Sequence, residues 1–396
     1  MTTFSDPPKE SFRPSMLLSD TRYRSITFQV IALALLVTAI WYLGSNLAAN
    51  LRAAGLNISF QFLGNPAGYD INQTSNLQAA WVGIINTLLV SFLACVTATI
   101  FGVVAGVLRL SNNWLIRKLM AGYVEIFRNI PVLIWILIIY TIMTAAMPAP
   151  SAFRGDDPAS SMMLGSFAFT NRGVYIPGPV WGPGSMIVVA TFVASVIGVF
   201  AYRRYATKLL YDTGRLLPML WPSVAILLLP TIIMFFIMGM PIGLDYPALK
   251  GFNFRGGIQI GAPLIALWFA LSIYTGAFIA ENVRAGIQAV SKGQSEAAAA
   301  LGLRSGRIMN LVVLPQALRV IIPPLISNYL NITKNSSLAI LVGYADITAT
   351  LGGITLNQTG RAIECVVLLM LFYLVISLGI SMVMNVYNNA TKLKER

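Results

Sequence analysis

Few residues in this chain could do chemistry on a ligand, because ionisable side chains are rare within its long apolar runs. Lys334 and Arg128 are two cations that fall inside or beside such runs, and Lys334 belongs to the polar stretch 331–337, NITKNSS. A lysine in the middle of a membrane helix costs about 2.5–3.5 kcal/mol unless it is paired or faces water. A cation placed there could hold the carboxylate of a small ligand.

The stretch around Lys334 has two interpretations. It could line a translocation path, for which the candidate residues are Lys334, Asn335, Ser336 and Asn331. Alternatively, Lys334 could belong to a buried polar network that ties helices together, with Glu125 or Glu281 as its partner.

Arg128 has three possible roles. It could bind substrate, pair with Glu125 one helical turn back, or extend toward the membrane interface. Glu281 and Arg284 repeat the three-residue spacing of Glu125 and Arg128, so the same kind of local helix pair is expected there.

Catalytic and metal-binding chemistry have no candidates. The chain has no histidine, and its two cysteines, Cys95 and Cys365, lie in apolar runs where packing roles are expected. The sequence contains no G-x-x-x-x-G-K-[ST] phosphate-binding loop. An enzyme is therefore not predicted.

The composition predicts an all-α polytopic membrane protein. Hydrophobic residues make up 57% of the chain and charged residues only 10%, against about 25% charged in soluble domains. Apolar runs of about 20 residues are long enough to cross a bilayer. We expect about eight spans, near 25–48, 81–108, 119–147, 184–202, 218–239, 263–282, 321–342 and 363–387. Gly102 and Gly106 would let another helix approach the second span closely.

The cations predict the orientation. With the N-terminus inside, nineteen Lys and Arg residues fall on inside segments and six on outside segments. This arrangement makes both termini and the loop 291–319 cytoplasmic. It also accounts for the net charge of +13 without a nucleic-acid partner.

The loop 291–319 resembles a protein-docking element. Ser291 and Gln294 have the spacing of a capping box, and Glu296 is expected in the first turn of the helix that follows. Gly302 is expected to end that helix in a left-handed conformation, and Pro315 to end or bend the next helix. An ordinary cytoplasmic hairpin between spans is the alternative.

Long outside loops are the other notable feature. The segment 175–183, YIPGPVWGP, is predicted to be a turn-rich surface segment with interfacial aromatic residues. These loops could receive a substrate-delivering protein or could be simple connectors.

Several motifs together resemble a known family. Glu296-Ala297-Ala298, Gly302 and Leu314-Pro315 are similar to the EAA loop of ABC importer permeases, with Val312 where isoleucine is usual. Further matches to the polar amino-acid permeases are 123–131 (YVEIFRNIP), 280–288 (AENVRAGIQ), 314–319 (LPQALR) and 334–338 (KNSSL). The insertion 148–261 resembles the enlarged permease subunits of general L-amino acid importers.

The resemblance implies a function. It implies a type I ABC importer permease in a bacterial inner membrane, which forms half of a path for L-amino acids. It implies three protein partners, namely an ABC ATPase dimer, a second homologous permease that forms a heterodimer, and a periplasmic amino-acid-binding protein. It implies no cofactor in this chain, since ATP and Mg would be bound by the ATPase. The residues it assigns to ATPase coupling are Glu296, Ala297, Ala298, Ala300, Leu301, Gly302 and Leu303.

The predicted organisation follows from the spans and the resemblance. Residues 1–24 form a cytoplasmic segment, 25–78 the first span and a periplasmic loop, 79–390 the permease domain and 391–396 a cytoplasmic tail. Within the permease domain, 148–261 adds two spans and a periplasmic loop, and 291–319 is the coupling loop. A stand-alone secondary transporter or channel is the alternative function, and it leaves the coupling loop unexplained.

Overall fold

The computed structural model describes residues 21–55, 58–67, 75–155 and 158–391. The chain divides into two units, Met1–Phe62 and Leu63–Arg396. In the first unit, α2 (Thr21–Ala53) is long and apolar enough to cross a membrane. The predicted N-terminal segment 1–24 lies outside the described residues except for its last four, which belong to α2. Of the predicted tail 391–396, only residue 391 is described, at the end of a helix.

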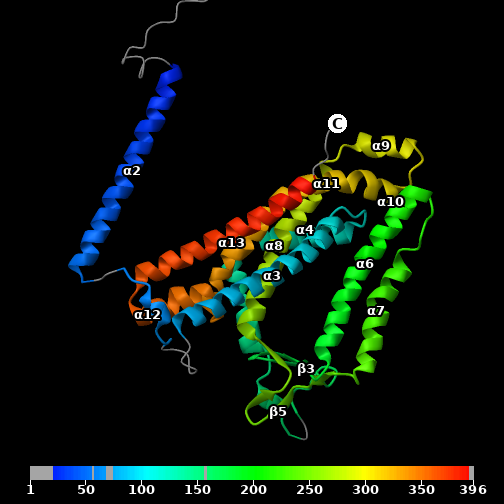
Figure 1. Ribbon diagram of the computed structural model, residues 1–396, viewed down its shortest axis with the longest axis horizontal. Coiled ribbons are helices and arrows are strands. Elements are labelled where there is room, and N and C mark those ends of the chain that lie inside the picture. The colour runs from blue at the N-terminus through cyan, green and yellow to red at the C-terminus, as the bar shows by residue number, and fades with distance from the viewer. Residues whose placement is uncertain (1–20, 56–57, 68–74, 156–157, 392–396) are drawn as a thin grey trace, which may run out of the picture. The chain divides into compact units, whose positions relative to one another are not determined.

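The second unit holds a bundle of helices (Figure 1). Its longer helices are α3 (Asn76–Leu108), α4 (Trp114–Asn129), α5 (Val132–Thr141), α6 (Ser185–Thr213), α7 (Leu220–Ile237), α8 (Ala262–Gln288), α11 (Leu314–Asn335) and α13 (Ala362–Thr391). Shorter helical elements are η1 (Gln61–Gly64), η2 (Ile142–Ala146), η3 (Pro150–Phe153), α9 (Lys292–Ala300), α10 (Ser305–Ile308), η4 (Met309–Val313), η5 (Ser336–Val342), η6 (Thr348–Thr355) and α12 (Leu356–Thr359).

Among the described residues, seven helices could cross a membrane by length and hydropathy, or eight if one bent pair counts as a span. The bent pair corrects the prediction of a continuous third span at 119–147. There α4 and the run Val132–Ala146 meet at 104°. The residue before Pro131 is forced out of helical geometry, and Ile130 has the extended values φ −108° and ψ 130°.

Close packing of α3 on α8 forms the centre of the bundle. A Cβ atom added at Gly102 would lie 2.5 Å from the Cβ of Ile279, and one at Gly106 would lie 2.7 Å from the carbonyl oxygen of Ala280. The two glycines therefore confirm the predicted close approach. The largest core cluster joins α3, α5, α8 and α11 around Val90, Ile136, Leu267, Leu271 and Ile332.

Pro315 lies at a different point in its helix from the one predicted. Pro315 lies in the first turn of α11, so it begins this helix and does not end the one before it. Pro323 and Pro324 lie inside α11, and a π-helical turn, η4, precedes that helix.

The insertion contains a small β module, formed by residues 148–183 and 240–261. β1 (Ala168–Thr170), β2 (Gly173–Ile176) and β7 (Ile258–Gly261) make an antiparallel sheet in that spatial order. Two antiparallel strand pairs complete the module. β3 (Gly178–Trp181) pairs with β4 (Ile242–Asp245) across the two helices of the insertion, and β5 (Ala248–Lys250) forms a hairpin with β6 (Asn253–Arg255).

This module corrects part of the prediction for 175–183: the segment is mainly β-strand and its first residue is buried, whereas Val180 and Trp181 are exposed, as predicted for a surface segment. Tyr175 is only 1% exposed, packs against Phe254 with ring centroids 5.2 Å apart, and donates a hydrogen bond to Asn253. Since β2 pairs with β7, the strand partner lies more than 80 residues away in the sequence. α6 and α7, which pack on one another, are long and apolar enough to be the two extra spans predicted in the insertion.

We predict that Gly102→Ala destabilises the bundle by about 1–3 kcal/mol, because the new methyl group overlaps Ile279 on the neighbouring helix. Thermal unfolding of the purified chain in detergent measures this loss. Gly122→Ala on α4 is the matched control, since its new Cβ meets no atom within 4 Å and alanine favours the helix. Equal unfolding temperatures for Gly102→Ala and the parent chain would contradict the packing argument.

Candidate coupling loop and translocation surface

The coupling loop, residues 291–319, leaves the end of α8 and forms α9. Gly302 has φ +79°, as predicted for a left-handed helix end. The amide of Leu303 donates to the carbonyl of Ala298 at 3.3 Å, and the amide of Gly302 donates to that of Ala299 at 2.9 Å. This hydrogen-bond pair is a Schellman motif, which fixes the direction of the chain after α9.

The start of α9 differs from the prediction. Ser291 is the N-cap residue, but its side chain makes no capping hydrogen bond, so the predicted capping box with Gln294 is wrong. Glu296 is the fifth residue of α9 and lies beyond its first turn. A capping box does occur elsewhere, between Ser75 and Gln78 at the start of α3.

The side chains of the coupling loop divide into an inner and an outer set. Ala298 is buried with Ile308 and Val313 in a cluster that also contacts Ile287 near the end of α8, and Leu303 packs against this cluster. The outer set is exposed, with Leu301 at 83%, and consists of Glu296, Ala297, Ala300, Leu301 and Gly302. The inner set fixes the loop to α8, and the outer set is free to meet another surface.

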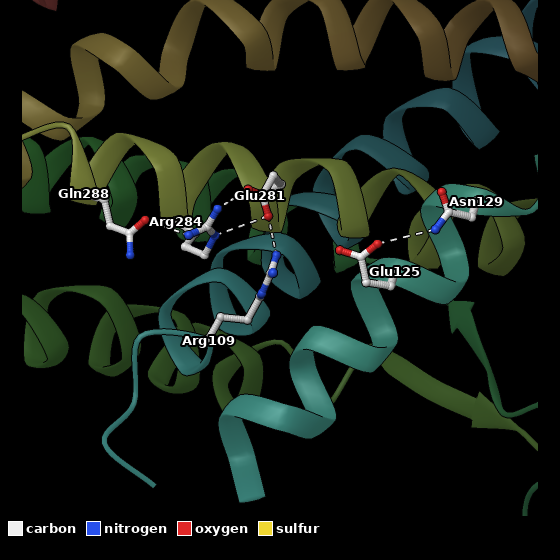
Figure 2. A network of polar contacts seen from close by, with 6 residues as sticks. All are labelled: Arg109, Glu125, Asn129, Glu281, Arg284 and Gln288. Carbon is white, nitrogen blue, oxygen red and sulfur yellow. Dashed lines mark hydrogen bonds and ion pairs between the residues drawn. The ribbon is translucent and has the colours of Figure 1, made fainter. Parts of the chain in front are cut away.

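An ion-pair cluster joins the last turns of α8 to the end of α3. Glu281 forms salt bridges with Arg109, the C-cap residue of α3, and with Arg284, one turn further along α8 (Figure 2). Arg284 also donates to the side chain of Gln288 at 2.6 Å. The predicted local pair of Glu281 and Arg284 is thus confirmed. Arg109 was missed, because 172 residues separate it from Glu281 and no local spacing indicates the contact.

Lys334 lies in the last turn of α11, where the helix dipole favours a cation. Its side chain is exposed, and no ion pair among the described residues involves it. The predicted pairing with Glu125 or Glu281 is wrong: Glu281 is bound by the two arginines, and Glu125 accepts a hydrogen bond from Asn129 at 3.4 Å (Figure 2).

The neighbours of Lys334 face different ways. Asn331 is exposed, Asn335 is half-buried, and Ser336 is fully buried and donates to the carbonyl of Thr333. Because the α-helix ends at Asn335 and continues as the 3₁₀ helix η5, this polar stretch marks a change of helix type within the segment Ser305–Val342.

The side chain of Arg128 lies against an aromatic ring. Its guanidinium carbon lies 5.3 Å from the ring centroid of Phe278 on α8, a cation–π contact. The described residues show no ion pair between Arg128 and Glu125, so the predicted local pair is wrong. Arg128 and Lys334 are therefore both exposed cations of the helical bundle.

Asp346 is a buried acid that the sequence did not single out. It lies in the loop 343–347, which hydrogen bonds tie to α3: Asn86 donates to the carbonyl of Ala345, and the amide of Ile347 donates to Thr87. Asp346 accepts from the amide of Ala349 at 2.8 Å. Burial raises the pKa of the Asp346 carboxyl to about 6. Because Asp346 lies in a loop, no helical or strand spacing in the sequence indicates that its side chain is buried.

Nothing in this arrangement resembles a catalytic centre. In the described part of the chain, no group of three or more His, Cys, Asp and Glu side chains could hold a metal ion. The polar groups are instead exposed cations on helices of the bundle, and a loop packed on the end of α8. The fold is that of a multi-pass membrane protein.

Comparison with known proteins assigns the family. The sequence profile described as "Binding-protein-dependent transport system inner membrane component" matches residues 186–392, just over half of the chain. The chain belongs to this family and is a permease subunit of an amino-acid ABC importer. The family match supports this function over a stand-alone transporter or channel.

Three relatives are informative. The chain is 49% identical to the glutamate/glutamine/aspartate/asparagine permease BztB of Rhodobacter capsulatus, over the full length of both. It is 41% identical to the general L-amino acid permease AapQ of Rhizobium johnstonii, over 98% of this chain and 96% of that protein. It is 30% identical to the glutamate/aspartate permease GltJ of Escherichia coli, over 52% of this chain and 81% of that protein.

We predict that Glu281→Gln destabilises the chain by about 1–3 kcal/mol, because Arg109, with a side chain only 12% exposed, loses its carboxylate partner. Thermal unfolding in detergent, completed as a double-mutant cycle with Arg109→Gln, isolates the pair. Glu125→Gln is the control, since Glu125 is exposed and makes one long hydrogen bond. Additive effects of Glu281→Gln and Arg109→Gln would show that the pair contributes nothing.

Proposed function

We propose that the outer set of the coupling loop docks on a separate ATPase subunit and moves this permease during ATP hydrolysis. Glu296, Ala297, Ala300 and Leu301 offer an exposed surface of small side chains around one large apolar residue. The inner set supports the proposal, because a loop packed on the end of α8 passes its displacement to that helix. ATP and Mg are bound by the ATPase partner and not by this chain.

The ion-pair cluster extends this connection. Glu281 and Arg284 lie in the last turns of α8, and Arg109 ends α3. A displacement of α9 therefore reaches α8 through the apolar cluster around Ala298 and reaches α3 through Glu281. In this proposal α3 and α8 move as one body when the ATPase closes.

We further propose that the exposed cations Lys334 and Arg128 face the translocation path, together with Asn331 and Asn335. The observation that supports this proposal is that Lys334 is exposed although it lies in a segment that could cross the membrane. Such a cation needs water or another polypeptide beside it. A path between this chain and a second permease subunit supplies both, so each chain forms half of the path.

The substrate proposal rests on the relatives. BztB is described as transporting glutamate, glutamine, aspartate and asparagine, and AapQ as transporting general L-amino acids. Cations on the path suit acidic substrates, whose side-chain carboxylate they attract. We propose acidic amino acids and their amides as substrates, a heterodimer of permeases, delivery by a periplasmic binding protein, and a bacterial inner membrane as the location. The N-in orientation remains a prediction.

Gly302→Val is expected to abolish ATP-driven uptake while the chain stays in the membrane. A branched residue at φ +79° is strained by about 1–2 kcal/mol and disrupts the turn that aims α9, although its Cβ meets open space. Uptake of labelled glutamate by proteoliposomes containing the complete transporter measures the effect. Gly302→Asn is the matched control, because asparagine tolerates the left-handed conformation and should retain most of the uptake.

Glu296→Lys should also uncouple uptake, since it inverts the charge of the outer set without touching the core. Full uptake by both Gly302→Val and Glu296→Lys would refute the coupling role.

Lys334→Gln is expected to slow aspartate uptake about tenfold while asparagine uptake changes little. The two substrates have nearly the same shape and differ in charge, and removal of one partly screened ion pair costs about 1–2 kcal/mol. Competition between labelled aspartate and labelled asparagine in the same proteoliposomes measures the ratio. Lys292→Gln, on the coupling loop, is the charge-matched control and should leave the ratio unchanged. Equal losses for both substrates would exclude a direct role of Lys334 in selecting charge.

A further inference from the structure

One face of α6 is covered by its neighbour α7. A Cβ atom added at Gly198 would lie 3.1 Å from Ile226, and the hydroxyl of Tyr202 donates to the carbonyl of Pro218 at 2.8 Å. Ala206 on the same face is 2% exposed. Residues spaced by three and four therefore turn this face toward α7.

The opposite face of α6 is exposed and changes character along its length. Val193, Ile197 and Phe200 form an apolar stripe with exposures of 52–66%. One turn later the same face carries cations and hydroxyl groups. They line a shallow groove of about 510 Å³, formed by Phe200, Arg203, Arg204, Thr207, Lys208 and Tyr211. The stripe and the groove are continuous, because all these residues follow helical spacing on one side of the helix.

The cations of the groove lack protein partners. Among the described residues, no salt bridge involves Arg203, Arg204 or Lys208, although Asp212 is one turn beyond Lys208. Three unneutralised cations within two turns attract an anion strongly. Tyr211 adds a hydroxyl group that can donate to a phosphate oxygen, whereas the hydroxyl of Thr207 donates to the carbonyl of Arg203 at 2.9 Å.

The position of the groove favours a lipid over a soluble anion. From Val193 to Arg204 the helix rises about 16 Å, close to half the thickness of a bilayer hydrocarbon core. α6 and α8 both leave the β module, and α8 runs on to the coupling loop. The groove therefore lies at the end of α6 that is remote from the β module, the predicted cytoplasmic side.

We propose that this groove binds the phosphate headgroup of an anionic phospholipid, with an acyl chain along Val193, Ile197 and Phe200. Arg204 and Lys208 hold the phosphate, and the apolar stripe accounts for selection of an amphiphile over a soluble phosphate. A soluble ATPase could cover the cations but could not follow the stripe into the bilayer. This site is separate from the proposed coupling loop and path, and it does not depend on the substrate.

The test uses the full chain copurified with its partner subunits. Native mass spectrometry counts the lipid molecules retained when the complex is titrated with dioleoyl phosphatidylglycerol or with dioleoyl phosphatidylcholine. The parent complex should retain phosphatidylglycerol preferentially. Arg204→Gln/Lys208→Gln should bind it about thirtyfold more weakly, because each cation near a membrane surface contributes about fivefold.

Arg117→Gln/Lys118→Gln on α4 is the matched control. It removes one arginine and one lysine, both exposed, from another helix. The control should keep the affinity of the parent complex for phosphatidylglycerol. If both double variants lose the same affinity for phosphatidylglycerol, the effect comes from general surface charge, and the proposed site is wrong.

Two further measurements complete the test. Tyr211→benzoylphenylalanine, illuminated in the otherwise unchanged complex, should crosslink to phosphatidylglycerol, so the assignment does not depend on the folding of a charge variant. Crosslinking to a partner subunit only, or equal retention of the two lipids, would overturn the proposal. Displacement of the lipid by millimolar glycerol 3-phosphate would do so as well, since it would identify a soluble phosphate ligand.

Discussion

The close contact between α3 and α8 is the constraint on which the rest of the bundle depends. In a bilayer the hydrophobic effect does not drive helices together, so their association relies on van der Waals packing and on small residues that permit it. Gly102 and Gly106 let the backbones of α3 and α8 approach closely. Gly286 of α8 likewise leaves room for Ile321 of α11. α8 is thus packed on several sides, and α5, α11 and α4 are arranged around it.

In the proposed coupling, this packing gives α8 a mechanical role as well as a structural one. Its final turns carry Glu281, bound to Arg109, and its end is continuous with the coupling loop. The Schellman turn at Gly302 and the buried Ala298 leave the loop little freedom to move independently. Rigid packing of this kind transmits displacement, because close-packed interiors resist deformation.

The insertion is packed separately from the rest of the bundle. Its β module has a separate small core around Tyr175 and Phe254, and its two helices pack mainly on each other. Relatives that match the chain over nearly its whole length show that this enlarged form is shared. A hairpin of two helices with one face uncovered needs lipid or protein against that face. The cations of α6 match the phosphate headgroups of the membrane, and the apolar stripe of α6 matches the acyl chains.

The sequence by itself determined much of what depends on neighbours along the chain: the apolar spans, the left-handed turn at Gly302 and the local pair of Glu281 with Arg284. Two other local predictions, the capping box at Ser291 and the pair of Glu125 with Arg128, were wrong. Only the tertiary structure decided the contacts between distant segments. It brought Arg109 to Glu281, paired β2 with β7, packed Gly102 against Ile279 and left Lys334 exposed without an acid beside it. The physical reason is that short-range spacing fixes helices and turns, whereas the partner of a buried or exposed charge depends on which remote residues the packing brings near.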